Sequence, residues 1–205
     1  QKGILFVESL GMEPFRFFQM MKWVYKKRVE DFELMTDLPR VMRARIKENA
    51  YISSLNIYTH LKSKDGAEKF SFLLKDGLVI ESVFIPSERR NTICISTQVG
   101  CRMGCIFCCT GKMGLKRNLS PSEIVNQVLH ITDHQKNNRI HNIVVMGMGE
   151  PLDNYDNLIP ALKIMTHESG LSFSPRRITV STCGILPKIS ELLKEVPVNI
   201  AISLN

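Results

Sequence analysis

The stretch STQVGCRMGCIFCCTGKMG, residues 96–114, contains four of the six cysteines of the chain. It follows NTICIST, residues 91–97, a short apolar segment typical of a buried strand. Cys101, Cys105 and Cys108 have the spacing C-x3-C-x2-C. Three thiolates at this spacing can hold three irons of a [4Fe–4S] cluster. The fourth iron would have no protein ligand in the loop, and an open metal position is where a substrate or cofactor binds. The stretch therefore predicts a cluster-binding loop.

A structural zinc site is the alternative for the same cysteines. Zinc requires four ligands, and Cys109, Cys94 or a histidine could supply the fourth. His130 and His134 are one helical turn apart, but nothing else marks them as ligands. Cys109 directly follows Cys108, so its side chain is expected to point elsewhere, and we interpret it as a bystander.

Composition and charge limit the class of protein. The chain has 205 residues, 44% of them hydrophobic and 23% charged, as in ordinary soluble globular proteins. No apolar run approaches the ~20 residues needed to span a bilayer, and the start lacks a secretory signal, so a cytoplasmic protein is expected. The net charge of +7 suggests a polyanionic partner such as RNA, although a solvated basic surface would also explain it.

The chain after residue 90 alternates between predicted strands and predicted helices. The apolar strands are NTICIST, HNIVVMGMG, RRITVST and VNIAISLN, and the first intervening helix has Ser120 as its cap, Pro121 at its first position and Glu123 three residues on. This alternation predicts a parallel α/β sheet or barrel. Four strands do not close an eight-stranded barrel, so we expect this chain to be a piece of a longer protein.

The chain before residue 91 has a different pattern. Residues 13–35 and 36–50 carry helical periodicity surrounded by basic side chains, and residues 68–86 alternate in strand fashion around Asp76-Gly77, a good hairpin turn. We therefore predict three parts. Residues 1–60 form a small helical domain that contacts RNA, residues 61–90 form a β-hairpin connector, and residues 91–205 form the first part of the barrel.

The cysteine loop resembles that of the radical S-adenosylmethionine (SAM) superfamily, in which the spacing C-x3-C-x2-C follows the first barrel strand and an aromatic residue, here Phe107, precedes the last cysteine. The sequence GMGEP, residues 147–151, resembles the glycine-rich SAM-contacting motif of that superfamily. Gly147 and Gly149 would let the backbone approach a ligand closely, and Glu150 could accept a hydrogen bond from an ammonium group.

A closer resemblance runs over essentially the whole chain. The segments PFR…MKWVY, ESVFIP, TICISTQVGC, RNLSPSEI, NIVVMGMGEPL, RRITVSTCG and AISLN resemble, in this order, the dual-specificity rRNA/tRNA adenine C2 methyltransferases of the RlmN type. A related group methylates adenine C8, and MGMGEP together with the PFR…KW start favours the C2 branch. The resemblance implies an α/β fold with the first four strands of a barrel of about six. It also implies methylation of one adenine in 23S rRNA and in tRNA through a methylated-cysteine intermediate.

The resemblance also implies cofactors, partners and site residues. The cofactors would be a [4Fe–4S] cluster held by Cys101, Cys105 and Cys108, and SAM. Glu81 matches the family's proton acceptor and Cys94 its disulfide-forming cysteine. The positions that match SAM contacts are Gly149, Glu150, Ser181, Ser203, Leu204 and Asn205. Flavodoxin is the expected electron donor, and a monomer is the expected state.

The sequence departs from the family pattern at three points. Asn205 stands where a histidine is more usual. Cys183 stands where serine or another small residue is usual, and we interpret it as structural. The methyl-carrying cysteine is expected far beyond residue 205, so this chain is expected to be inactive by itself. The competing interpretations are the C8 methyltransferase and a basic zinc-containing RNA-binding module without catalysis.

Overall fold

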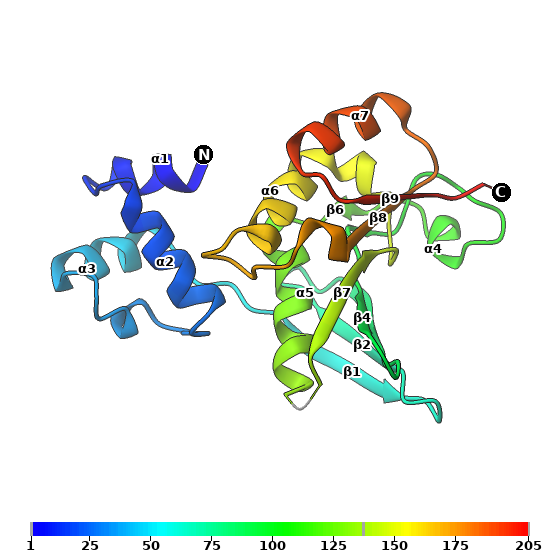
Figure 1. Cartoon of the computed structure of the whole chain (residues 1–205), viewed down its shortest axis with the longest axis horizontal. Coiled ribbons are helices and arrows are strands. Elements are labelled where there is room, and N and C mark those ends of the chain that lie inside the picture. Colours follow the sequence, from blue (N-terminus) through cyan, green and yellow to red (C-terminus); the bar gives the residue numbers. More distant parts are fainter. Residues whose placement is uncertain (1, 137, 205) are drawn as a thin grey trace. The chain divides into compact units, whose positions relative to one another are not determined.

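The computed structural model describes residues 2–136 and 138–204, and the chain folds as two compact units (Figure 1). One unit extends to Ser53 and also includes Ile164–Ser172. The other contains Ser54–Lys163 and the chain from Phe173 onward. No helix within the described part of the chain is both long and apolar enough to cross a membrane.

The first unit is helical. It contains α1 (Lys2–Ser9), α2 (Phe15–Tyr25), the 3-10 helix η1 (Phe32–Leu34) and α3 (Arg40–Asn49). Its core is formed by side chains from all four elements and their connections, namely Val7, Met12, Trp23, Phe32, Met35, Leu38 and Ile46. The predicted helix over 13–35 is too long, because α2 ends at Tyr25. The chain turns after this helix, and Arg28 takes a left-handed φ of 57°. The second predicted helix begins at Arg40 rather than Thr36, directly after Pro39.

The second unit is built on one seven-stranded sheet in the order β1-β2-β3-β4-β7-β8-β9. The strands are β1 (Asn56–Lys62), β2 (Glu68–Leu73), β3 (Val79–Ile85), β4 (Asn91–Cys94), β7 (Ile140–Val145), β8 (Ile178–Thr182) and β9 (Asn199–Ile202). Strands β1 to β4 pair antiparallel, and β4, β7, β8 and β9 pair parallel. The four predicted parallel strands and the β2–β3 hairpin are confirmed, whereas β1 and the fusion of the hairpin to the parallel sheet were not predicted.

The predicted hairpin turn has the expected chemistry. Gly77 takes a positive φ of 82°, and the Asp76 carboxylate accepts a hydrogen bond from the backbone N–H of Leu78. Pairing of Val83 with Cys94 then continues the hairpin into the parallel strands.

Strand register sorts the side chains onto two faces. Val83 lies opposite Cys94, and Cys94 lies opposite Val144, so these three share a face. Because side chains alternate along a strand, Glu81 lies on the same face as Val83. Ser181, which is two residues beyond the paired Thr179, also lies on this face. The other face carries the fully buried side chains Phe70, Phe72, Ile80, Ile93, Ile143, Ile178 and Val180.

Helix α5 (Pro121–His134) packs on that apolar face. Its inward side chains include Ile124, Val128 and Ile131, all buried. The buried Gln127 of this helix links it to β3 and to the chain just after β4. The Gln127 Oε1 atom accepts hydrogen bonds from the Ser82 hydroxyl (2.6 Å) and the Ser96 N–H (2.8 Å). Two longer helices, α6 (Tyr155–Thr166) and α7 (Leu186–Glu195), follow later in the chain.

The start of α5 provides a test of local stability. Ser120 accepts from the backbone N–H of Glu123, and the Glu123 carboxylate accepts from the Ser120 N–H (2.8 Å), which confirms the predicted cap. We expect Ser120→Ala to lower the free energy of unfolding by about 1 kcal/mol, as measured by urea denaturation. Ser174 also precedes a helix, η3 (Pro175–Arg177), but makes no side-chain cap. Ser174→Ala is therefore the control, and equal losses in the two variants would contradict the cap's contribution.

Candidate functional site

A small two-stranded sheet closes the cysteine loop. Strand β5 (Gln98–Val99) pairs antiparallel with β6 (Arg117–Asn118), with Gln98 opposite Asn118. The N–H of Lys116 donates to the Val99 carbonyl (2.8 Å), so the two ends of the loop are held together just beyond β4. Gly100 takes a φ of 75° where the loop leaves β5.

The three cysteines of the C-x3-C-x2-C spacing line one cavity of about 480 Å³. Cys101 is buried, and Cys105 and Cys108 are half-buried. The N–H of Cys108 donates to the Cys105 carbonyl (3.0 Å), which forms a tight turn between them. Cys109 begins the short helix α4 (Cys109–Lys112), is exposed, and does not contribute to the cavity wall.

The electrostatics around these thiols favour a cation. Burial raises the pKa of the Cys101 thiol, and the Glu150 carboxylate and the neighbouring Cys108 and Cys105 thiols raise it further. Several groups that become negative on ionisation therefore face one another. A bound metal centre opposes this rise in the thiol pKa, because it stabilises the thiolate form directly. A donor set of three sulfurs lining one cavity fits a thiolate-bound iron–sulfur cluster with one iron left open.

The glycine-rich turn after β7 forms another part of the cavity wall. A Cβ on Gly147 would lie 2.8 Å from the backbone carbonyl carbon of Ile95. A Cβ on Gly149, whose φ is 102°, would lie 2.8 Å from the backbone nitrogen of Gln98. Real Cβ atoms essentially never come so close, so these two positions need glycine for the turn to rest against the β4–β5 segment.

Glu150 is a buried carboxylate with fixed orientation, only 5% exposed. Its Oε1 accepts from the Leu152 N–H (3.0 Å), and its Oε2 accepts from the Cys183 N–H (2.9 Å). Its own N–H donates to Oε1 of Gln98 (2.8 Å). A carboxylate has about four acceptor sites, so each oxygen keeps acceptor capacity for a donor in the cavity.

The carboxyl ends of β8 and β9 complete the wall. Ser181, Cys183, Ser203 and Leu204 line the cavity, and the Ser181 and Ser203 hydroxyl oxygens are 3.3 Å apart. Asn205 lies outside the described residues. Cys183, which we interpreted as structural, is exposed and lines the cavity. Burial of its thiol and the nearby Glu150 carboxylate raise the pKa of Cys183 to about 11.

Glu81 and Cys94 lie outside the cavity wall. The register places both on the sheet face that also carries Ser181. The Glu81 carboxylate is half-exposed and pairs with Lys69 (Nζ to Oε1, 2.8 Å). Burial raises the pKa of the Cys94 thiol, so this thiol stays protonated at neutral pH.

Comparison with known proteins identifies the family. Residues 95–205 match the family described as the Radical SAM superfamily. The chain belongs to the radical SAM superfamily. The match begins within the cysteine-loop region and runs through the glycine-rich turn and the last two strands, so it covers the whole described cavity wall. It favours a cluster over the structural zinc site considered from the sequence.

The N-terminal residues match a second family. Residues 4–52 match the "Ribosomal RNA large subunit methyltransferase N-terminal domain". The chain is 50% identical to the dual-specificity RNA methyltransferase RlmN of Desulfotalea psychrophila, over 98% of this chain and 58% of that protein. It is also 50% identical to RlmN of Syntrophotalea carbinolica, over 98% of this chain and 53% of that protein. The resemblance to the RlmN type is confirmed, and the chain spans a little over half the length of these curated relatives.

A solved structure supports the fold. A radical SAM methyltransferase from Sphaerobacter thermophilus has a TM-score of 0.86 and 38% sequence identity, over 98% of this chain and 60% of that one. This similarity confirms the predicted partial barrel of the radical SAM type.

The sequence interpretation missed residues that position the site. Gln98 donates through Nε2 to Asn118 (2.8 Å) and to Asp153 (2.7 Å), while its Oε1 orients Glu150. One available signal was that Gln98 is a polar residue two positions before Gly100, at the carboxyl end of a predicted strand. The cavity-facing Cys183 had a similar signal, because it directly follows β8.

Proposed function

We propose that this chain is part of a radical SAM methyltransferase that methylates C2 of one adenine in 23S rRNA and in tRNA through a methylated-cysteine intermediate. The observation that carries the proposal is the convergence of three cysteine thiols and the anchored Glu150 on one cavity. The match of residues 4–52 to an rRNA methyltransferase domain supports RNA as the substrate. The basic net charge of +7 supports the same class of partner.

The proposal assigns the cavity residues to two cofactors. Cys101, Cys105 and Cys108 hold the [4Fe–4S] cluster, and the SAM contacts are Gly149, Glu150, Ser181, Ser203, Leu204 and Asn205. When bound and reduced, the cluster supplies the single electron that cleaves SAM and starts radical chemistry. A radical route suits adenine C2, because this carbon is electron-poor and offers no nucleophile for ordinary methyl transfer. The fixed Glu150 carboxylate would orient the SAM ammonium by a charge-assisted hydrogen bond.

Two residues are assigned to steps on the RNA. Glu81 accepts the adenine proton, and the Lys69 ammonium, 2.8 Å from its Oε1, orients the carboxylate. Cys94 forms the disulfide that releases the product. Its sulfur, after losing its proton, attacks the sulfur that joins the methyl-carrying cysteine to the adenine. The bond from that sulfur to the methylene carbon breaks, and its electron pair passes to the product, which takes up a proton to give the methyl group. None of the six cysteines is assigned the methyl-carrying role. The electron donor is flavodoxin, and the protein acts as a cytoplasmic monomer.

The cofactor assignment is tested by electron paramagnetic resonance on the chain reconstituted with iron and sulfide without oxygen. We expect a reduced [4Fe–4S] signal that shifts when SAM is added, because one iron is open to it. In the variant Glu150→Gln we expect the cluster signal to persist and about tenfold more SAM to be needed for the shift. Stoichiometric zinc without a cluster signal would contradict the proposal and support the RNA-binding module.

The RNA product separates C2 from C8 chemistry. RNA treated with the intact protein should contain 2-methyladenosine, identified by mass spectrometry against a synthetic standard. Recovery of 8-methyladenosine alone would support the C8 alternative instead. The same assay on residues 1–205 should give no sustained methylation, and turnover by this chain would overturn our assignment of the methyl-carrying cysteine to another part of the protein.

A further inference from the structure

Two histidines and a buried glutamate meet where the β1–β2 hairpin reaches the last turn of α5. His60 comes from β1, Glu68 from β2 and His134 from α5. The His60 Nε2 atom lies 2.8 Å from Oε2 of Glu68, and the His134 Nε2 atom lies 3.5 Å from the same oxygen. The three ligand atoms all lie within 4.8 Å of one another. Side chains from one hairpin and from a helix far along the chain therefore come together outside the cavity described above.

We propose that His60, Glu68 and His134 form a zinc site that is distinct from the cysteine loop. Two imidazole nitrogens and one carboxylate oxygen are a donor set that zinc accepts, with water in the fourth position. Zinc–ligand distances of 2.0–2.1 Å in a tetrahedron place neighbouring ligand atoms about 3.3 Å apart. The two distances to Oε2 lie on either side of this value, so small side-chain rotations suffice to surround an ion.

The carboxylate is ready to act as a ligand. The Glu68 side chain is only 6% exposed. Burial opposes its ionisation, but hydrogen bonds from Lys62, Gln135 and His60 outweigh this and lower the pKa of Glu68 to about 2. Neighbouring donors therefore already orient both oxygens, and Oε2 is the one that faces the two histidines.

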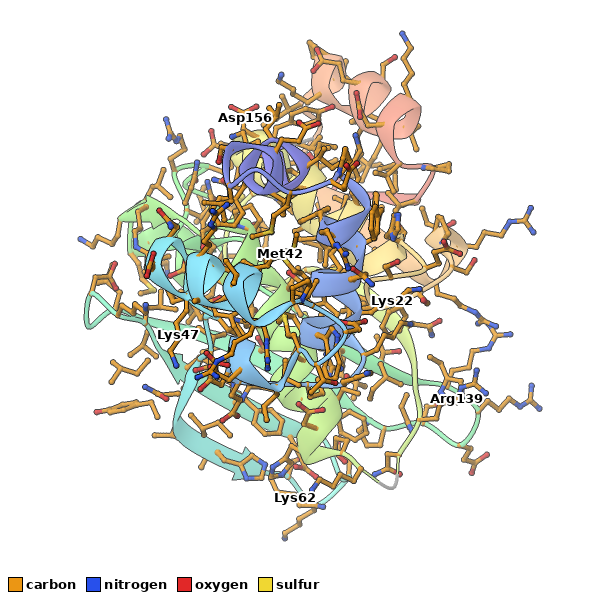
Figure 2. The ribbon with its side chains drawn as sticks, turned by 90° about the vertical axis from the view of Figure 1, so that its left-hand side faces the viewer. Lys22, Met42, Lys47, Lys62, Arg139 and Asp156 are labelled. Atoms are coloured by element: carbon orange, nitrogen blue, oxygen red, sulfur yellow. The ribbon has the colours of Figure 1, made fainter. Side chains whose placement is uncertain are left out.

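Lys62 is the group that competes with a metal ion. Its ammonium lies 3.0 Å from Oε1 of Glu68, whereas both histidines face Oε2. The Lys62 side chain is 64% exposed, so water can solvate its ammonium when that group leaves Glu68. Figure 2 labels Lys62 near this edge of the sheet. A divalent ion would replace the positive charge that the ammonium supplies to Glu68.

The imidazole rings are held in place by an apolar neighbour. The His60 ring stacks on the buried Phe70 at a centroid distance of 4.5 Å, and the His134 ring meets Phe70 edge-on at 5.0 Å. The two imidazoles meet each other edge-on at 4.7 Å. Fixed rings lose little freedom on binding, which favours affinity. His130, one turn before His134, is not part of the set, because its Nε2 accepts from the Leu55 N–H (3.1 Å).

A metal ion at this site would stabilise the edge strand β1. All seven residues of β1 are exposed, so this strand is held mainly by its pairing with β2. Ligands from β1, β2 and α5 would link the edge strand to the helix through one ion. The site would therefore stabilise the edge of the sheet without taking part in the reaction.

Cobalt is the probe that separates this site from the cysteines. The chain with its cysteine loop filled by iron and sulfide is titrated with Co²⁺ alone. We expect one equivalent to bind with visible absorption bands of nitrogen and oxygen ligands and without the sulfur-to-metal band that cysteine ligation produces. Zn²⁺ should displace the cobalt. Binding that carries the sulfur band, or no binding beyond that of the variants below, would overturn the proposal.

Four single variants make the test specific. His60→Asn and Glu68→Gln should each weaken Co²⁺ binding at least about tenfold. His141→Asn, outside the cluster, should leave it unchanged. Lys62→Ala removes an exposed competitor and should tighten binding about two- to fivefold. Circular dichroism verifies that each variant is folded. If Lys62→Ala leaves the affinity unchanged and His60→Asn binds as the parent chain does, the site does not exist.

Discussion

Replacing Cys105 with alanine should lower the iron bound after reconstitution from about four atoms per chain to less than about one. Cys105 lines the cavity together with Cys101 and Cys108, and a cluster held by three thiolates does not survive on two. The readouts are iron and sulfide analysis and the electron paramagnetic resonance signal of the reduced protein. Loss of the cluster would also remove the SAM-dependent shift.

The matched control for this variant is Cys109→Ala. Cys109 follows Cys108 directly but is exposed and lies outside the cavity wall. We expect this variant to bind the same iron as the parent chain. If Cys109→Ala lost the cluster while Cys108→Ala retained it, the ligand set would be wrong, and the loop would have to bind metal in another arrangement.

The second large effect is expected at Gly100. A Cβ at this position would lie 1.8 Å from the Gly114 carbonyl oxygen, and the backbone φ is 75°. Both the overlap and the left-handed conformation oppose a side chain here. We expect Gly100→Ala to lower the free energy of unfolding by about 4 kcal/mol or more, the range that steric overlap in the interior reaches. Urea denaturation measures this loss, and cluster binding should fall with it because the loop ends can no longer close.

Gly114→Ala separates the two causes. Gly114 has a similar φ of 65°, but a Cβ there would have no neighbour within 4 Å. Its substitution should cost only about 1–2 kcal/mol, the conformational penalty alone. If the two variants lost equal stability, the close approach of Gly100 to the Gly114 carbonyl would not determine the closure of the loop.

Features that depend on neighbouring residues could be predicted from the sequence. The cap of α5 needs only Ser120 and Glu123, three residues apart, and the hairpin turn needs only Asp76 and Gly77. The three clustered cysteines and the glycine-rich turn are likewise compact motifs, and the structure places both at one cavity. The predicted length of the first helix was wrong because helical periodicity continued past the point where Arg28 turns the chain.

The sequence by itself therefore determined the alternation of strands and helices, the superfamily, and the cysteines and glycine-rich turn that mark the site. Only the tertiary structure decided how the hairpin joins the parallel sheet, how Gln98 and the Cys183 N–H hold Glu150, and how His60, Glu68 and His134 meet. The physical reason is the range of the interactions. Turns, caps and periodicity depend on residues a few positions apart, whereas strand register and buried polar contacts join residues tens of positions apart, and no local pattern encodes those pairings.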